Sequence, residues 1–133
     1  MTDSVTKFRN IIVCEDIRDE VGNKKSLMGV LSGDILVPTF PATVQIAVFF
    51  EYLPDSDDGD HLSIGFRLLR GDGEIANGGM QAIVAPKQTA SFVLPRALIT
   101  FENETTFKML ASVNGRPEEE ILSRKIGKAP PTS

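Results

Sequence analysis

The stretch TVQIAVFFEYL, residues 43–53, decides the fold because its side chains alternate between two faces. One face is apolar and carries Val44, Ile46, Val48, Phe50 and Tyr52. The other face is mixed and carries Thr43, Gln45, Ala47, Phe49 and Glu51. A period of two predicts a β-strand that buries one face in a core.

The same period recurs along the chain and predicts further strands. HLSIGFRLLR (61–70) and TTFKMLASV (105–113) each place their large apolar residues at every second position. KFRNIIVC (7–14) puts Phe8, Ile12 and Cys14 on one face but also Ile11 and Val13 on the other. A strand that is apolar on both faces is predicted to lie centrally in its sheet.

Turn residues separate these runs. EVGNKK (20–25) and NGRP (114–117) read as hairpin turns, and RGDGE (70–74) contains Asp72-Gly73, a preferred type I′ pair. Because the segment 120–126 follows NGRP, we predict a strand there rather than a helix. Seven to nine short strands with this spacing predict an all-β, antiparallel β-sandwich. We expect one domain over residues 1–133, with an ordered core at about 7–127 and loose ends.

Composition narrows the possible cellular location of the protein and the possible classes of partner. A net charge of −4 with pI near 5.0 argues against nucleic acid as the main partner, because phosphate binding needs clustered basic residues. No apolar run reaches the roughly 20 residues of a membrane helix, so no membrane association is predicted. A single cysteine excludes an internal disulfide, and the N-terminus has no apolar export segment. We therefore predict a cytoplasmic protein.

Several motifs resemble a family of short, uncharacterised bacterial proteins grouped as a domain of unknown function. The similar features are the apolar strand 11–13, the acidic pair 15–16, the turn 22–25, the segments 27–29 and 38–42, and the stretches RLLRGDGE and FKMLASVNGRPEEEILSRKI. The resemblance covers roughly residues 8–126 and implies an immunoglobulin-like sandwich. It implies no activity and no catalytic residue.

CEDIRDE (14–20) contains the only cysteine and four carboxylates. A reactive cysteine needs a cationic neighbour that lowers its pKa, whereas Glu15 and Asp16 would raise it. We therefore interpret Cys14 as a small core residue at the end of the first strand. The acidic residues after it read as a charged strand end and a solvated turn.

PDSDDGDH (54–61) is the sharper metal candidate. Asp55, Asp57, Asp58 and Asp60 share one loop, and an oxygen-rich loop can hold calcium. The alternative is a hydrophilic hairpin loop in which Asp and Gly supply turn geometry. One histidine and one cysteine are too few for a structural zinc site, and no cofactor motif is present.

Ala47 and Phe49 lie on the predicted outer face of the 43–53 strand and form a candidate interface for a homo-oligomer. The alternative is a strand covered on both faces by its own chain. We predict a non-enzymatic binding or assembly module that is homo-oligomeric. A calcium- or small-ligand-binding sandwich is the alternative function. A third is an enzyme that uses scattered carboxylates such as Glu15, Asp16, Asp34 and Glu51.

Overall fold

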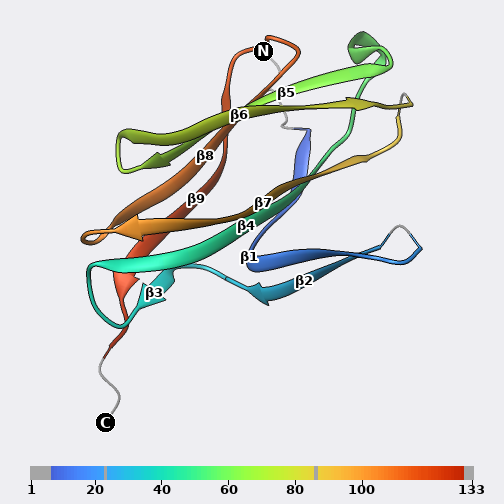
Figure 1. Ribbon diagram of the computed structural model, residues 1–133. Coiled ribbons are helices and arrows are strands. Elements are labelled where there is room, and N and C mark those ends of the chain that lie inside the picture. The colour runs from blue at the N-terminus through green and yellow to red at the C-terminus, as the bar shows by residue number, and fades with distance from the viewer. Residues whose placement is uncertain (1–6, 23, 86, 131–133) are drawn as a thin grey trace.

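The computed structural model describes residues 7–22, 24–85 and 87–130, which form two β-sheets packed face to face (Figure 1). The first sheet has four strands in the order β2 (Lys24–Val30), β1 (Phe8–Glu20), β4 (Ala42–Tyr52) and β7 (Ala90–Phe101). The second has five in the order β3 (Ile35–Val37), β9 (Glu119–Lys128), β8 (Thr105–Val113), β5 (His61–Arg70) and β6 (Gly73–Ile83).

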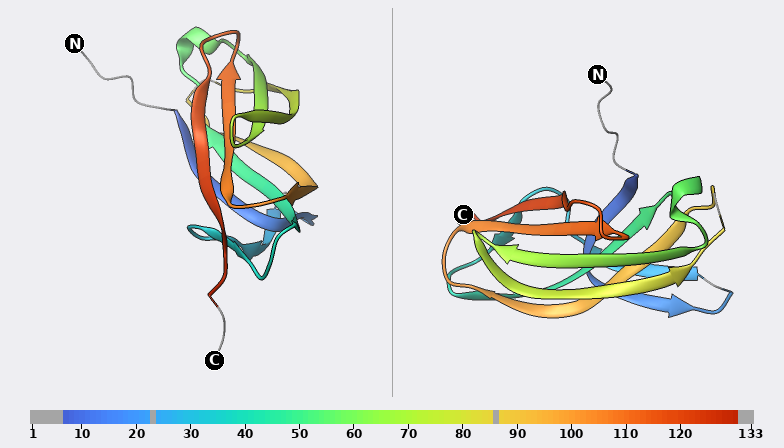
Figure 2. Two further views of the ribbon diagram at one scale, coloured as in Figure 1. Left: turned by 90° about the vertical axis from the view of Figure 1, so that its left-hand side faces the viewer. Right: turned by 90° about the horizontal axis from the view of Figure 1, so that it is seen from above.

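The predicted all-β sandwich is confirmed, at the upper end of the predicted strand number. The sheets form two layers (Figure 2), and all pairs are antiparallel except β3 with β9. Strands β4 and β7 are neighbours in one sheet, while β9, β8, β5 and β6 are consecutive in the other. The immunoglobulin-like arrangement that the resemblance implies stays a prediction.

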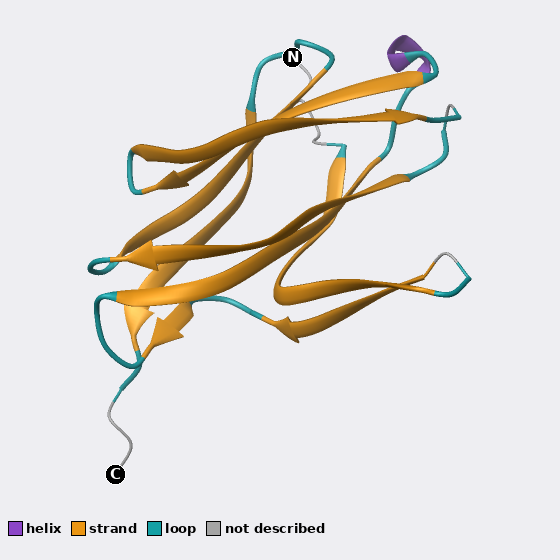
Figure 3. Ribbon diagram, in the orientation of Figure 1, coloured by secondary structure: helices purple, strands orange, loops and turns teal. Residues whose placement is uncertain are grey.

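Strands dominate the described chain, and a single 3-10 turn, η1 (Ser56–Asp58), is its only helical element (Figure 3). No helix among the described residues is long and apolar enough to cross a membrane.

The sequence predicts loose ends at residues 1–6 and at about 127–133. The second prediction is wrong at its start, because β9 continues to Lys128 and the Ala129 N–H donates a hydrogen bond to the Val37 carbonyl. Residues 1–6 and 131–133 lie outside the described residues, as does Asn23 of the first predicted hairpin turn.

The core lies between the sheets and is rich in phenylalanine. Phe50 of β4 stacks on Phe92 of β7 with ring centroids 5.5 Å apart. Phe101 meets Phe107 of the opposite sheet edge-to-face at 6.4 Å, which joins the two layers. The predicted core face of β4 is confirmed, since Ile46, Val48, Phe50 and Tyr52 all belong to the buried cluster.

The predicted faces of β1 are wrong beyond Asn10. A bulge shifts the pairing with β4 between Arg9 and Ile12, and Asn10 has a positive φ of 53°. An extra residue in one strand reverses the alternation that follows it. Ile11 and Val13 therefore join the core, while Ile12 and Cys14 turn to the outer face.

The first strand is also longer than predicted, because β1 continues through CEDIRDE to Glu20 and pairs with β2. Opposite charges face each other across this hairpin, with Lys25 Nζ 2.6 Å from Asp19 Oδ1 and Glu20 opposite Lys24. Oppositely charged cross-strand pairs stabilise a solvent-exposed hairpin, so this segment is a pair of strands where a charged turn was predicted. We call residues 15–29 the arm.

The predicted type I′ turn at Asp72-Gly73 is wrong by one residue. Arg70 pairs with Gly73, so the two turn residues are Gly71 and Asp72. Only Gly71 has a positive φ, at 61°, which is typical of a type II′ turn with glycine first.

Candidate functional site

The arm crosses the outer face of β4 and β7, the face turned away from the core. Gln45 Nε2 of β4 donates a hydrogen bond of 2.9 Å to the carbonyl of Glu15. Arg96 Nη1 of β7 lies 3.8 Å from Asp16 Oδ2. These contacts hold the arm over the sheet and leave open space between the two.

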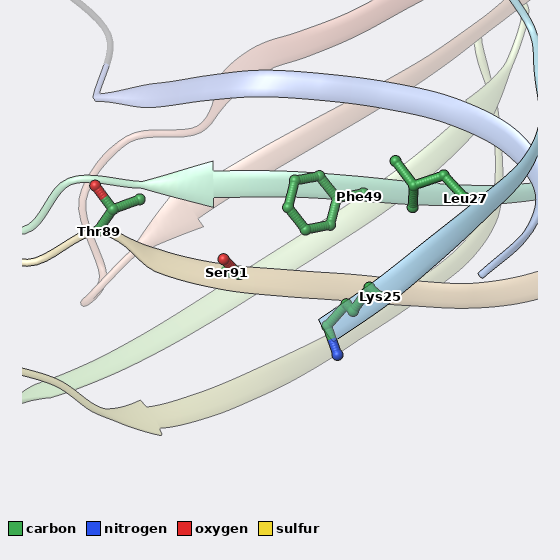
Figure 4. A pocket seen from close by; sticks show the side chains of 5 residues that line it. All are labelled: Lys25, Leu27, Phe49, Thr89 and Ser91. Carbon is green, nitrogen blue, oxygen red and sulfur yellow. The ribbon is translucent and has the colours of Figure 1, made fainter. Parts of the chain in front are cut away.

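That space includes a cleft of about 560 Å³ lined by Lys25, Leu27, Phe49, Thr89 and Ser91 (Figure 4). Phe49 and Leu27 are half-buried and lie beside each other, so the cleft has an apolar floor. The two hydroxyls and the Lys25 ammonium are exposed at its rim. An apolar floor with a polar rim suits the docking of an amphipathic group.

A second cleft of about 680 Å³ continues along the arm and shares Lys25 with the first. Its apolar lining comes from Ile17 of the arm and from Val93 and Pro95 of β7. Lining positions recur at every second residue, at 89 just before β7 and at 91, 93 and 95 within it, so both clefts follow one face of that strand. We call the two clefts together the β7 groove.

The two predicted interface residues have different positions. Phe49 lines the groove, and its role in an interface stays a prediction. Ala47 cannot contact a partner, because it is 0% exposed. It pairs with Cys14, which is equally buried, beneath the point where the arm crosses the sheet beside Gln45. The prediction for Ala47 is therefore wrong, because the chain's own arm covers it.

The carboxylates of the acidic loop point in different directions. Asp55 caps the 3-10 turn by accepting a hydrogen bond of 2.9 Å from the Asp57 backbone N–H, and it forms an ion pair with Lys7. The hydrogen bond from the Lys7 ammonium holds the pKa of Asp55 below its usual value. Asp57 and Asp60 are exposed.

Asp58 turns inward and anchors the loop. Its side chain is 0% exposed and forms an ion pair with Arg116, from the turn between β8 and β9. It also accepts a hydrogen bond of 2.9 Å from the Asp55 backbone N–H, and Tyr52 Oη and Asn114 Nδ2 each lie 3.4 Å away. No sequence pattern indicated Arg116 as the partner, since the two residues are distant along the chain.

The predicted calcium site therefore lacks a convergent ligand set in the described part of the chain. Among those residues, no group of three or more histidines, cysteines, aspartates or glutamates could hold a metal ion. Asp55 and Asp58 instead stabilise the turn and form ion pairs, while Asp57 and Asp60 are exposed. No observation favours calcium over the alternative of a hydrophilic loop.

Cys14 is buried as predicted, although it faces outward rather than into the main core. Burial raises the pKa of its thiol, and nearby Asp16 and Glu15 raise it further. The Sγ atom donates to the Asp16 carbonyl at 3.4 Å. This environment disfavours the thiolate that nucleophilic chemistry needs.

No protein-family model matches the chain, and no curated protein sequence matches it as a relative. The resemblance to the uncharacterised bacterial family therefore stays a prediction. Only the geometry of the groove supports a function for this chain.

Proposed function

We propose that the protein is a non-enzymatic β-sandwich module that binds a protein partner through the β7 groove. The observation that carries the proposal is Phe49, a half-buried aromatic side chain on the outer face of a central strand, flanked by Leu27. Interface hot spots are commonly aromatic side chains set in pockets with a polar rim. Here Lys25, Thr89 and Ser91 supply that rim.

The contacts of the carboxylates support a non-enzymatic role. Glu51 is held by hydrogen bonds from Asn10 and, at 3.5 Å, from Ser91. Asp16 lies beside Arg96, and the Glu15 side chain folds against Gly29. Each of these groups has its own local contact, whereas general acid–base chemistry needs two groups that converge on one substrate.

Three further expectations stay predictions: a cytoplasmic location, calcium or small-ligand binding by the acidic loop, and nucleic acid not being a partner. The homo-oligomeric state is part of the proposal. It does not depend on Ala47, because the side chain of Ala47 is buried.

The groove is tested by affinity capture from a lysate of the source organism, with the protein as bait in three versions. Phe49→Ala removes the aromatic floor of the groove. Leu98→Ala is the matched control, because Leu98 is 72% exposed on β7 but lies outside both clefts. We expect the wild type and the control to capture at least one protein that Phe49→Ala captures several-fold less. The same protein in purified form should bind the wild type and the control more tightly than it binds Phe49→Ala. Equal capture by all three folded baits would contradict the proposal.

A further inference from the structure

The edges of the two sheets differ in their protection against pairing with another chain. Proteins block edge strands with lysines, prolines, bulges or short length, because unpaired N–H and C=O groups otherwise recruit a further strand. Edge strand β2 carries Lys24, Lys25 and a left-handed Gly29, and edge strand β3 has only 3 residues. Edge strand β7 has Pro95 and Arg96 where its register shifts.

The fourth edge strand, β6, carries none of these devices over most of its length. Its sequence GEIANGGMQAI has no lysine, arginine or proline, and its one charged residue, Glu74, lies 3.3 Å from Arg67 of the neighbouring strand. Its pairing with β5 shifts once near Ile75 and is regular from Ala76 to Ile83. On its other side this regular stretch has no neighbouring strand among the described residues. The segment 76–83 is therefore a regular and uncharged edge.

We propose that β6 is a homodimer interface in which two copies pair their β6 strands antiparallel about a two-fold axis through Gly79. The two-fold axis must pass between the two copies of one residue, so that this residue lies opposite itself. Only then do the outer faces of the two copies lie on the same side of the joined sheet. The pairing would join two five-stranded sheets into one continuous sheet. It specifies the assembly part of the proposed function and does not depend on any partner in the β7 groove.

Gly79 is the best centre because of the residues that then face each other. Asn77 would lie opposite the partner's Gln81, so that two side-chain amides able to donate and accept meet on each side of the axis. Ala76 would lie opposite the partner's Ala82, which brings two small side chains together. Glu74 of each copy falls beyond the paired stretch at opposite ends, so no like charges are brought together.

The expected dimer is weak. A contact limited to one pair of edge strands is smaller than the roughly 1,200–2,000 Å² of a standard stable interface. We therefore expect monomer and dimer to exchange at micromolar concentrations, visible in sedimentation velocity from 1 to about 100 µM protein.

Charge variants test both the surface and the register. In Asn77→Glu/Gln81→Glu, carboxylates face each other across the axis, and we expect the dissociation constant to rise at least tenfold. In Asn77→Glu/Gln81→Lys, each glutamate faces the partner's new lysine, and we expect dimerisation at wild-type strength or better. Both positions are exposed. Asn77→Glu removes the hydrogen bond of 3.0 Å from Asn77 Nδ2 to Glu74, but position 77 lies opposite Arg67 within its own sheet. Both variants carry Asn77→Glu, so the comparison between them does not depend on that local change.

A cysteine placed on the axis gives an independent readout. In Gly79→Cys the two residues would be about 4.5–5.5 Å apart at Cα, within the range of a disulfide. A side chain fits there, because the nearest atom to its Cβ would be the Ile64 carbonyl oxygen at 3.4 Å. Ser63→Cys on the interior strand β5 is the control, and native Cys14 is too buried to react. We expect oxidation to cross-link Gly79→Cys and not Ser63→Cys.

A monomeric wild type up to about 100 µM would overturn the proposal, as would equal dimerisation of the two charge variants. The groove and the edge can fail separately. Phe49→Ala should dimerise like the wild type whether or not the groove binds a partner.

Discussion

Removing Arg116 should destabilise the sandwich because it leaves the Asp58 carboxylate buried without its cation. Breaking a buried ion pair by deleting one partner costs about 3–5 kcal/mol. Asp58 is 0% exposed, but the Arg116 side chain is 43% exposed, so water already screens part of the pair. Three donors also remain on Asp58, from Asp55, Tyr52 and Asn114. We therefore expect Arg116→Ala to cost about 2–3 kcal/mol, at or just below the lower limit of that range.

A double-mutant cycle separates charge from packing. Asp58→Asn keeps the side-chain shape and an oxygen for the Asp55 N–H but removes the buried charge. In that background Arg116→Ala leaves no unpaired buried carboxylate, so we expect its cost to fall by about 1–2 kcal/mol, in the range of coupling between groups in contact.

Urea unfolding, followed by circular dichroism at low micromolar protein, measures the free energy of unfolding of the wild type, the two single variants and the double variant. Thermal unfolding should show Arg116→Ala about 8–12 °C below the wild type, at roughly 4 °C per kcal/mol for a domain of this size. Additive effects of the two substitutions would refute the reasoning, because Arg116 would then stabilise the fold only through its own packing.

Three further predictions concern single residues. Gly78→Ala should cost about 1 kcal/mol in urea unfolding, because its Cβ would lie 2.8 Å from the Phe66 ring, whereas Gly79→Ala at a roomier position should be neutral or stabilising. Cys14 should react with a thiol reagent at least a hundredfold more slowly than a free thiol until denaturant is added, since it is 0% exposed; rapid reaction in buffer would contradict its burial. Hydrogen bonding to Arg67 lowers the pKa of Glu118, so it adds stability above the ordinary pKa of 4.5 that is lost as the pH falls through the folded-state value. Glu118→Gln should therefore show a shallower loss of stability between pH 6 and about 2, and an unchanged slope would argue against the pair.

The sequence predicted the strands but not where their faces change. Within 43–53 and 61–70 the alternation is unbroken over the core positions, so period two identified the buried residues correctly. The bulge at Asn10 reversed the faces of the first strand, and a period shows no such insertion in advance. The arm was missed because EDIRDE reads as a turn until its charges are matched with KKS across the hairpin.

The candidate sites were less predictable, because they depend on contacts between distant segments. The alternation of the strand alone predicted that Phe49 lies on the outer face, where it lines the groove. Ala47 was assigned wrongly because only the folded arm shows what covers it. The partner of Asp58 comes from the β8–β9 turn, and no local pattern links that turn to the acidic loop.

The arm separates the demands of folding from those of recognition. Among the described residues, no position between 15 and 29 belongs to the buried core cluster, although the arm supplies Leu27 and Lys25 to the groove. Substitutions in its sequence therefore cost the sandwich little, and a hairpin of another sequence could be grafted between Cys14 and Val30, which face each other across β1 and β2. Under the proposed function, the fold would be a scaffold whose specificity can be exchanged through one hairpin.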